Sequence, residues 1–219
     1  MFLGTVGAMA ETMTMNRVIH NAVRRDLGRL DVALGAVRDG DTRRAGDLRR
    51  AFANLHRELK HHHEGEDANI FPMLAGAGVD RQLLDAMESE HEAMAEALAD
   101  AARAMDTYAA SATAADAAAA REHVGRLREV VDRHLDHEES DLEPLMMAQV
   151  GTPEWDAVEK KLRSRPIGEA GQFFAWLLDG MDEPSRVYLR STIPGPVTTV
   201  LSKVFGRRYH REVAPVWRA

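Results

Sequence analysis

Apolar residues recur at steps of three to five positions along much of the chain, and this spacing predicts amphipathic α-helices. Four long helical segments are expected before residue 150. They run from about Thr12 to the polar turn Asp39–Asp41, from about Thr42 towards Asn69, from about Asp80 through Met105, and from the alanine-rich stretch 109–120 through Leu145. Residues 1–11 lack this pattern, so we expect them to be frayed or loosely docked. Two antiparallel helix pairs form a four-helix bundle.

The pattern changes after Val150. Thr152 and Pro153 form an N-cap and first-turn pair that opens a short helix to about Arg163. An apolar run around Trp176 and one or two further helices follow. We therefore predict an all-α protein with two parts. The bundle covers residues 12–150, and a helical C-terminal extension over residues 151–219 packs on the bundle or on a partner subunit.

Polar residues interrupt the apolar faces of the predicted helices in a repeated order. The segments that begin at His62 and His134 share a carboxylate at +4, a second carboxylate at +5, an aliphatic residue at +8 and a proline at +10. These residues are Glu66, Asp67, Ile70 and Pro72 in the first segment, and Glu138, Glu139, Leu142 and Pro144 in the second. Upstream, His20 precedes His62 by 42 residues, and His91 precedes His134 by 43. Each half of the repeat therefore offers one histidine, then His-x3-Glu.

This repeat predicts a metal site inside the bundle. Residues four apart lie on one face of an α-helix, with Cβ atoms roughly 5 to 6 Å apart, so a histidine and a glutamate at this spacing can bind the same ion. The six candidate ligands are His20, His62, Glu66, His91, His134 and Glu138. Burying two carboxylates without cations is severely unfavourable, whereas bound cations remove that penalty.

Six ligands suit two ions. We expect His20 and His62 to bind one ion and His91 and His134 the other, with Glu66 and Glu138 spanning both. Octahedral ions would retain positions for an oxo or hydroxo bridge and for an exogenous molecule. Iron fits this nitrogen and oxygen set, manganese is next, and zinc is a competitor.

The second helix carries three consecutive histidines, and we expect only one of them to be a metal ligand. We choose His62 because it lies three residues after Leu59 and four before Glu66. His61 and His63 lie about 100° to either side, so we expect them at the boundary or exposed. Asp67 and Glu139 are expected to support the ligands or to lie at the surface.

Composition narrows the function classes. The chain has no cysteine, which excludes disulfides, thiolate metal sites and a cysteine nucleophile. The net charge of -7 gives no overall nucleic-acid footprint. Residues 184–219 carry seven Arg or Lys against one Glu, which we interpret as a solvated basic face. No segment approaches the ~18 apolar residues of a membrane span, and the amino-terminal segment lacks the basic start of a secretory signal. We expect a soluble cytoplasmic protein.

The ordered pattern His20, His62-x3-Glu66, His91, His134-x3-Glu138, with its EDANIFP and EESDLEP continuations, resembles the hemerythrin-like, HHE cation-binding family over roughly residues 15–148. The resemblance implies an up-down four-helix bundle that holds a non-haem di-iron centre. It also implies that the four histidines are terminal ligands and that the two glutamates bridge.

The chain departs from the oxygen-carrying members of that family in two ways. Ala95 and Met87 stand one turn from His91, where a second histidine would be needed, and the last carboxylate is Glu at +4 rather than Asp at +5. Both departures argue against simple reversible oxygen carriage. They favour a centre that binds O2, peroxide or nitric oxide and reacts with it.

Two functions follow as expectations. The first is a di-iron oxidoreductase that decomposes hydrogen peroxide, as the resemblance to histidine-poor relatives implies. The second is a module that binds or senses O2, nitric oxide or iron without turnover, and whose basic extension reports to a partner. A homodimer is compatible with either. A metal-free bundle is the remaining alternative, and it would need a hydrogen-bond partner for each of six buried polar groups.

Overall fold

The structure is a computed structural model that describes residues 13–218, and these residues form helices joined by turns, with no strand among them. The all-α fold predicted from the sequence is therefore confirmed. Thr12 and the segment 1–11, which we expected to be frayed, lie outside the described residues. Contacts along the backbone divide the chain into two compact units. One runs from Leu27 to Arg165, and the other contains the described residues before Leu27 and after Arg165.

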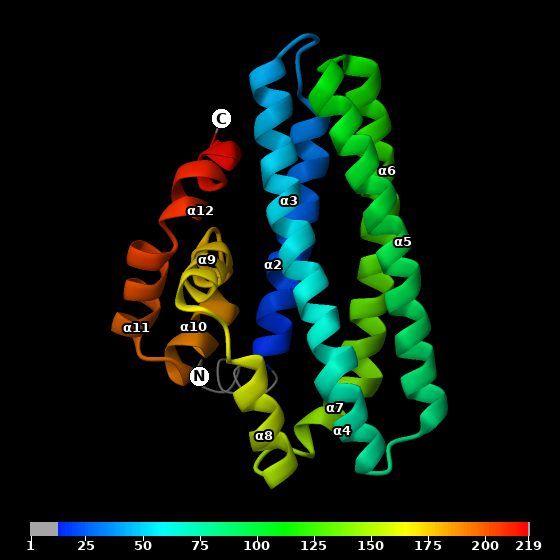
Figure 1. The fold of residues 1–219 in the computed structure, drawn as a ribbon, viewed down its shortest axis with the longest axis vertical. Coiled ribbons are helices and arrows are strands. Elements are labelled where there is room, and N and C mark those ends of the chain that lie inside the picture. The colour runs from blue at the N-terminus through cyan, green and yellow to red at the C-terminus, as the bar shows by residue number, and fades with distance from the viewer. Residues whose placement is uncertain (1–12, 219) are drawn as a thin grey trace, which may run out of the picture. The chain divides into compact units, whose positions relative to one another are not determined.

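The unit from Leu27 to Arg165 is a helical bundle (Figure 1). Its long helices are the part of α2 (Met15–Gly35) that begins at Leu27, α3 (Thr42–Gly65), α5 (Arg81–Ser111) and α6 (Ala114–His137). α3 and α5 run in opposite directions, as do α5 and α6 (Figure 1). Asp31 of α2 accepts a hydrogen bond from Arg121 Nε of α6 at 2.8 Å. The order of these helices is that of the predicted up-down bundle.

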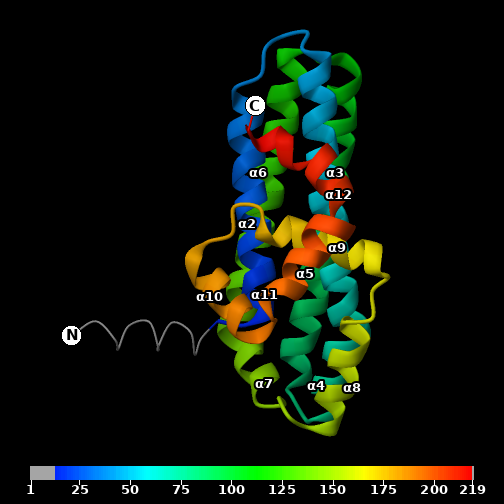
Figure 2. The same ribbon diagram turned by 90° about the vertical axis from the view of Figure 1, so that its left-hand side faces the viewer.

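Two of the bundle helices continue through a π-helical turn. α3 leads into η1 (Glu66–Ile70) and α4 (Phe71–Gly76), and α6 leads into η2 (Glu138–Leu142) and α7 (Glu143–Met147). α8 (Pro153–Leu162) follows and packs beside α4 (Figures 1 and 2). The sequence pattern placed α8 in the extension, whereas its contacts group it with the bundle helices.

Short polar side chains cap the starts of these helices, and Thr152 does so as the sequence predicts. Asp41 accepts a hydrogen bond from the Arg44 backbone N at 2.9 Å, and Thr152 accepts one from Trp155 N at 3.2 Å. Such side chains stabilise a helix start because the first backbone N–H groups have no partner within the helix. The alanine-rich stretch is nearly all helical. α5 ends at Ser111, its C-cap Ala112 lies in the left-handed region with φ 53°, and α6 begins two residues after Ala112.

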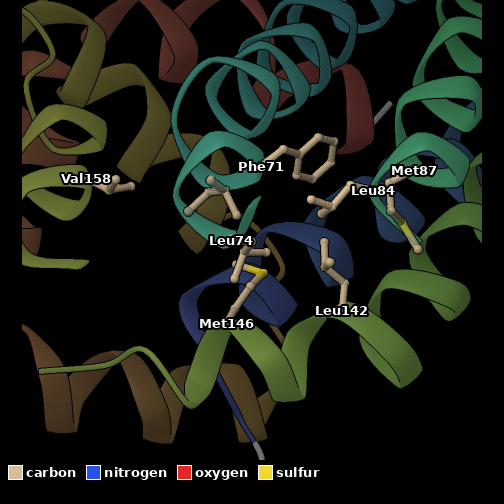
Figure 3. Packing of buried hydrophobic residues seen from close by; sticks show 8 residues of the cluster. Phe71, Leu74, Leu84, Met87, Leu142, Met146 and Val158 are labelled. Carbon is tan, nitrogen blue, oxygen red and sulfur yellow. The ribbon is translucent and has the colours of Figure 1, made fainter. Parts of the chain in front are cut away.

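An apolar cluster fills one end of the bundle unit (Figure 3). Figure 3 labels its members Phe71, Leu74, Leu84, Met87, Leu142, Met146 and Val158. These residues come from α4, α5, η2, α7 and α8. The Phe71 ring also stacks on the His91 ring, with centroids 5.3 Å apart. The cluster therefore places apolar side chains directly beside a predicted metal ligand.

The second unit contains the extension helices and the start of α2. These helices are α9 (Ile167–Leu178), α10 (Glu183–Thr192), α11 (Gly195–Val200), the π-helical turn η3 (Leu201–Phe205), α12 (Arg207–Glu212) and the 3-10 helix η4 (Ala214–Arg218). Trp176 is fully buried, and its Nε1 donates to Asp26 Oδ2 at 2.8 Å. The Tyr209 hydroxyl donates to Asp179 Oδ2 at 2.9 Å. Burial raises the pKa of Tyr209, and nearby carboxylates raise it further.

Not one helix between residues 13 and 218 combines the length and the apolar character needed to cross a bilayer.

Candidate metal centre

Five of the six predicted ligands belong to the bundle unit. His62 lies on α3, His91 on α5 and His134 on α6, while Glu66 begins η1 and Glu138 begins η2. The sixth, His20, lies on the amino-terminal half of α2, in the other unit, and is buried. Its role as a ligand stays a prediction from the sequence repeat.

Each glutamate of the repeat opens a π-helical turn. The Phe71 backbone N–H bonds to Glu66 O, and the Glu143 N–H bonds to Glu138 O, five residues back in both cases. After one intervening residue, each turn is followed by a proline, Pro72 or Pro144. Proline has no N–H to donate, and its ring clashes with the carbonyl four residues before it, so the helix widens there. The sequence pattern predicted that the second helix runs from about Thr42 towards Asn69. Instead it widens at Glu66 and then continues as α4.

Glu66 lies between two histidines from different helices. Its Oε1 is 3.3 Å from His62 Nε2, and its Oε2 is 3.7 Å from His91 Nε2. Among residues 13–218, neither oxygen has a hydrogen-bond partner, although Glu66 is only 4% exposed. The second glutamate repeats part of this geometry, since Glu138 Oε2 is 3.8 Å from His134 Nε2. A carboxylate whose two oxygens face two histidines has the arrangement needed to bridge two ions.

His63 does not lie where the sequence pattern predicted. We expected it at the boundary or exposed, but it is only 8% exposed. Its ring stacks on His91, with centroids 4.4 Å apart, and meets His134 edge-on at 5.4 Å. Within the described part of the chain, His63 Nε2 has no hydrogen-bond partner. One sequence signal was available: Leu55, Leu59 and His63 are spaced four residues apart, and His63 precedes Glu66 by three.

The imidazoles of His91 and His134 point at each other. Their Nε2 atoms are 3.2 Å apart. His91 Nδ1 donates to Asp67 Oδ1 at 2.7 Å, and His134 Nδ1 donates to Glu90 Oε2 at 2.9 Å. A carboxylate on Nδ1 fixes the proton on that nitrogen, which leaves the Nε2 lone pair free for a metal. Two lone pairs that face each other across 3.2 Å repel unless a cation lies near both.

The sequence analysis did not predict that Glu90 and His137 take part in the site. The second oxygen of Glu90 accepts a hydrogen bond from His137 Nδ1 at 2.8 Å, so Glu90 joins a buried histidine to a half-exposed one. The available signal was that Glu90 directly precedes His91 and that His137 lies three residues after His134. That spacing alone is common on helix surfaces, so it did not separate these residues from ordinary polar ones.

The electrostatics of the cluster favour a cation. Burial lowers the pKa of His63 well below 6.5, and the neighbouring histidines lower it further. Burial also lowers the pKa of His134, while the Glu138 carboxylate partly opposes that change. Burial raises the pKa of Glu66 well above 4.5, and the charge of Glu138 adds to the rise. Neutral imidazoles beside two carboxylates that repel each other form a site whose unfavourable charge a cation would neutralise.

The donor atoms also fit a transition metal. Imidazole nitrogen and carboxylate oxygen suit iron, manganese and zinc, and the described residues contain no thiolate that would favour a softer ion. His63, His91 and His134 each offer a nitrogen, and these three atoms lie within 4.8 Å of one another. Metal–nitrogen bonds of about 2.1 Å allow two nitrogens on one ion to lie at most roughly 4 Å apart, so only small side-chain adjustments are needed.

The chain was compared with protein families, with curated proteins and with solved structures. The family model described as the hemerythrin HHE cation binding domain matches residues 16–146, which is more than half of the 219-residue chain. The comparisons with curated proteins and with solved structures gave no match. The matched residues include α3, α5 and α6 and all the histidines and glutamates described above. The chain therefore belongs to the hemerythrin HHE cation-binding domain family, and its buried His/Glu cluster is that of a metal-binding module.

Proposed function

We propose that the protein is a non-haem di-iron protein that decomposes hydrogen peroxide. The observation that carries the proposal is the position of Glu66. It is a buried carboxylate whose two oxygens face histidines on two different helices, with no hydrogen bond to either oxygen from residues 13–218. A single-ion site would not need both oxygens directed in this way. Two iron ions are the cofactor that we propose, with manganese or zinc as substitutes.

The proposed ligands are the six residues of the repeat. His62, His91 and His134 are terminal ligands, Glu66 and Glu138 bridge, and His20 is added from the sequence pattern alone. Bound iron would supply redox steps and a Lewis-acid position for a small oxygen species. The protein itself would hold the ligand side chains in position. Asp67 and Glu90 fix the orientation and the tautomer of His91 and His134 through Nδ1.

Apolar side chains restrict water at the site. The Phe71 ring covers one face of His91, and Met87 lies one turn before His91 on α5 with no exposed surface. A water-poor surrounding strengthens the electrostatic interactions between the ligands and a bound ion. At the other side, the Glu90 carboxylate links His134 to the half-exposed His137. Protons released or taken up in peroxide turnover would have a hydrogen-bonded connection towards solvent there.

Oxygen evolution from hydrogen peroxide by the iron-loaded full-length protein tests the proposal. His91→Ala and Glu138→Ala should each lower the turnover rate at least about 100-fold, since each removes a group that holds the metal. His56→Ala is the matched control because His56 lies on α3 and its ring contacts Phe52. Turnover that is equal in all three variants would refute the assigned site.

A second function is favoured by one observation. The buried His63 adds an imidazole beside His91 and His134, and a shortage of imidazoles at this point was one of the two departures that argued against reversible oxygen binding. We propose as the alternative that the centre binds O2 or nitric oxide without turnover. The same iron-loaded protein would then evolve no oxygen from peroxide, but its visible spectrum would change reversibly when O2 or nitric oxide is added and removed.

A further inference from the structure

The repeat of six ligands does not account for every histidine nitrogen at the centre. His63 comes from α3, His91 from α5 and His134 from α6, so three helices of one unit each bring one imidazole to the same point. Two of these imidazoles are held through Nδ1 by carboxylates, as metal-bound histidines usually are. The third, His63, is buried and has an Nε2 without a hydrogen-bond partner among residues 13–218.

We infer that His63, His91 and His134 together hold one metal ion, which makes His63 a ligand that the repeat does not contain. The inference rests on the proposed function only in that the buried cluster binds a divalent cation. Three neutral imidazoles suit Fe2+, Co2+ and Zn2+. Met87 and Ala95 stand one turn from His91, so α5 offers no second nitrogen there, whereas the His63 ring on α3 lies 4.4 Å from the His91 ring.

The consequence is an asymmetric pair of ions. The ion held by His63, His91 and His134 has three imidazoles from helices of the bundle unit, in addition to the carboxylates. The other ion has His62 from that unit and His20 by prediction. We expect the first ion to bind more tightly and first, so that the open position for a small molecule lies at the second ion. Asp67 and Glu90 are positioning residues for the tighter ion, since they act through His91 and His134.

Titration of chelator-treated full-length protein with Co2+, followed by calorimetry and by the visible absorption of the bound ion, tests this inference. The wild-type protein should bind the first Co2+ more tightly than the second. His63→Ala should weaken the tighter site at least about 100-fold, because loss of a supporting partner alone costs about 10- to 100-fold in affinity. His63→Gln, which keeps most of the side-chain volume, should weaken it similarly, and His56→Ala on the same helix should leave both sites unchanged.

A measurement on the wild-type protein keeps the inference testable whatever the variants do. X-ray absorption at the cobalt edge, with one equivalent of Co2+ per chain, should show about three imidazoles on the ion. Two imidazoles, unchanged affinities in folded His63→Ala, or an equal loss in His56→Ala would each overturn the inference. Peroxide takes no part in these measurements. A protein that shows three imidazoles but no peroxide turnover would therefore refute the proposed reaction and support the role of His63.

Discussion

Glu66, a proposed metal ligand, lies where a carboxylate destabilises the metal-free fold. Its carboxylate is 4% exposed, and its oxygens lie near the nitrogens of His62 and His91 and near the charge of Glu138. In a metal-free protein this carboxylate has lost its hydration, and its oxygens have gained no hydrogen bond from the described residues. A group in that position destabilises the fold until a cation is bound.

Glu66→Gln should therefore stabilise the metal-free protein at neutral pH, by roughly 1 to 3 kcal/mol, since it replaces a buried carboxyl that must either keep an uncompensated charge or take up a proton with an amide that is neutral at every pH. The effect depends on pH. The pKa of Glu66 is raised above 4.5, so the folded protein holds a proton that the unfolded chain releases, and wild-type stability falls as pH rises above about 4.5. Urea unfolding of both chelator-treated proteins between about pH 4.5 and pH 8 measures the difference.

His63 provides the internal control for that experiment. Its pKa is depressed, so the folded protein stays neutral there while the unfolded chain takes up a proton, and stability falls as pH drops below 6.5. Both proteins share this loss, so it cancels when they are compared. A difference between Glu66→Gln and wild type that stays constant across the whole pH range would contradict the assignment of the raised pKa to Glu66.

The histidine tripeptide shows what could and could not be predicted for single residues. The +4 spacing and the repeat identified Glu66, His91, His134 and Glu138 as buried polar residues, and all four are buried. The choice of His62 over His63 assumed a face wide enough for one imidazole. The buried face is wider than that, because His62 Nε2 lies 3.3 Å from Glu66 Oε1 while the His63 ring stacks on His91, so both neighbouring histidines turn inward. Helical spacing alone does not give the width of a buried face.

At the scale of elements, helix ends were easier to predict than helix contacts. Asp41, Asp80 and Thr152 begin α3, α5 and α8 as the sequence pattern indicated, because N-capping depends on a few adjacent residues. α2 ends at Gly35, four residues before the predicted turn at Asp39. The π-helical turns at Glu66 and Glu138 were not predicted. They depend on the proline that follows and on packing around the site. The spacing of apolar residues along the chain reports neither of these.

The close approach of α9 to the end of η3 is a helix contact that the sequence pattern did not predict. A Cβ atom added at Gly171 of α9 would overlap Phe205 and would lie 2.8 Å from the Gly206 backbone nitrogen. A Cβ atom at Gly206 would lie 2.6 Å from Ala175 Cβ. Both segments belong to the unit that contains the extension helices. The two backbones pack so closely that neither position has room for a side chain.

Gly171→Ala should therefore lower the free energy of unfolding by about 1 to 3 kcal/mol, the usual cost of an overpacked contact. Gly168→Ala is the matched control, because Gly168 lies on the same helix with nothing within 4 Å of the added carbon. There the substitution should be neutral or stabilising by up to about 1 kcal/mol, since alanine is the better helix former. Urea unfolding followed by circular dichroism compares the two, and equal stabilities would contradict the tight contact.

For the whole molecule, a metal bound at the proposed centre would link helices that are distant in the sequence. His63 and Glu66, His91, and His134 and Glu138 come from three segments separated by at least two dozen residues, all within the unit from Leu27 to Arg165. A ligand that binds the folded chain but not the unfolded one stabilises it by about 2.7 kcal/mol when present at 100 times its dissociation constant. That stabilisation should be greatest in the segments that hold the ion.

Hydrogen exchange read by mass spectrometry should show this distribution. Iron(II) added without oxygen should slow amide exchange up to about 100-fold in α3, η1, α5, α6 and η2, because opening these segments then requires the ion to leave. Peptides from α9 to α12 serve as the comparison and should change least. If His20 is a ligand, as the repeat predicts, the amino-terminal half of α2 should gain protection too, and His20→Ala should abolish that gain while leaving the gain in α5 and α6. Equal protection of both units, or no change at the two π-helical turns, would contradict the assigned centre.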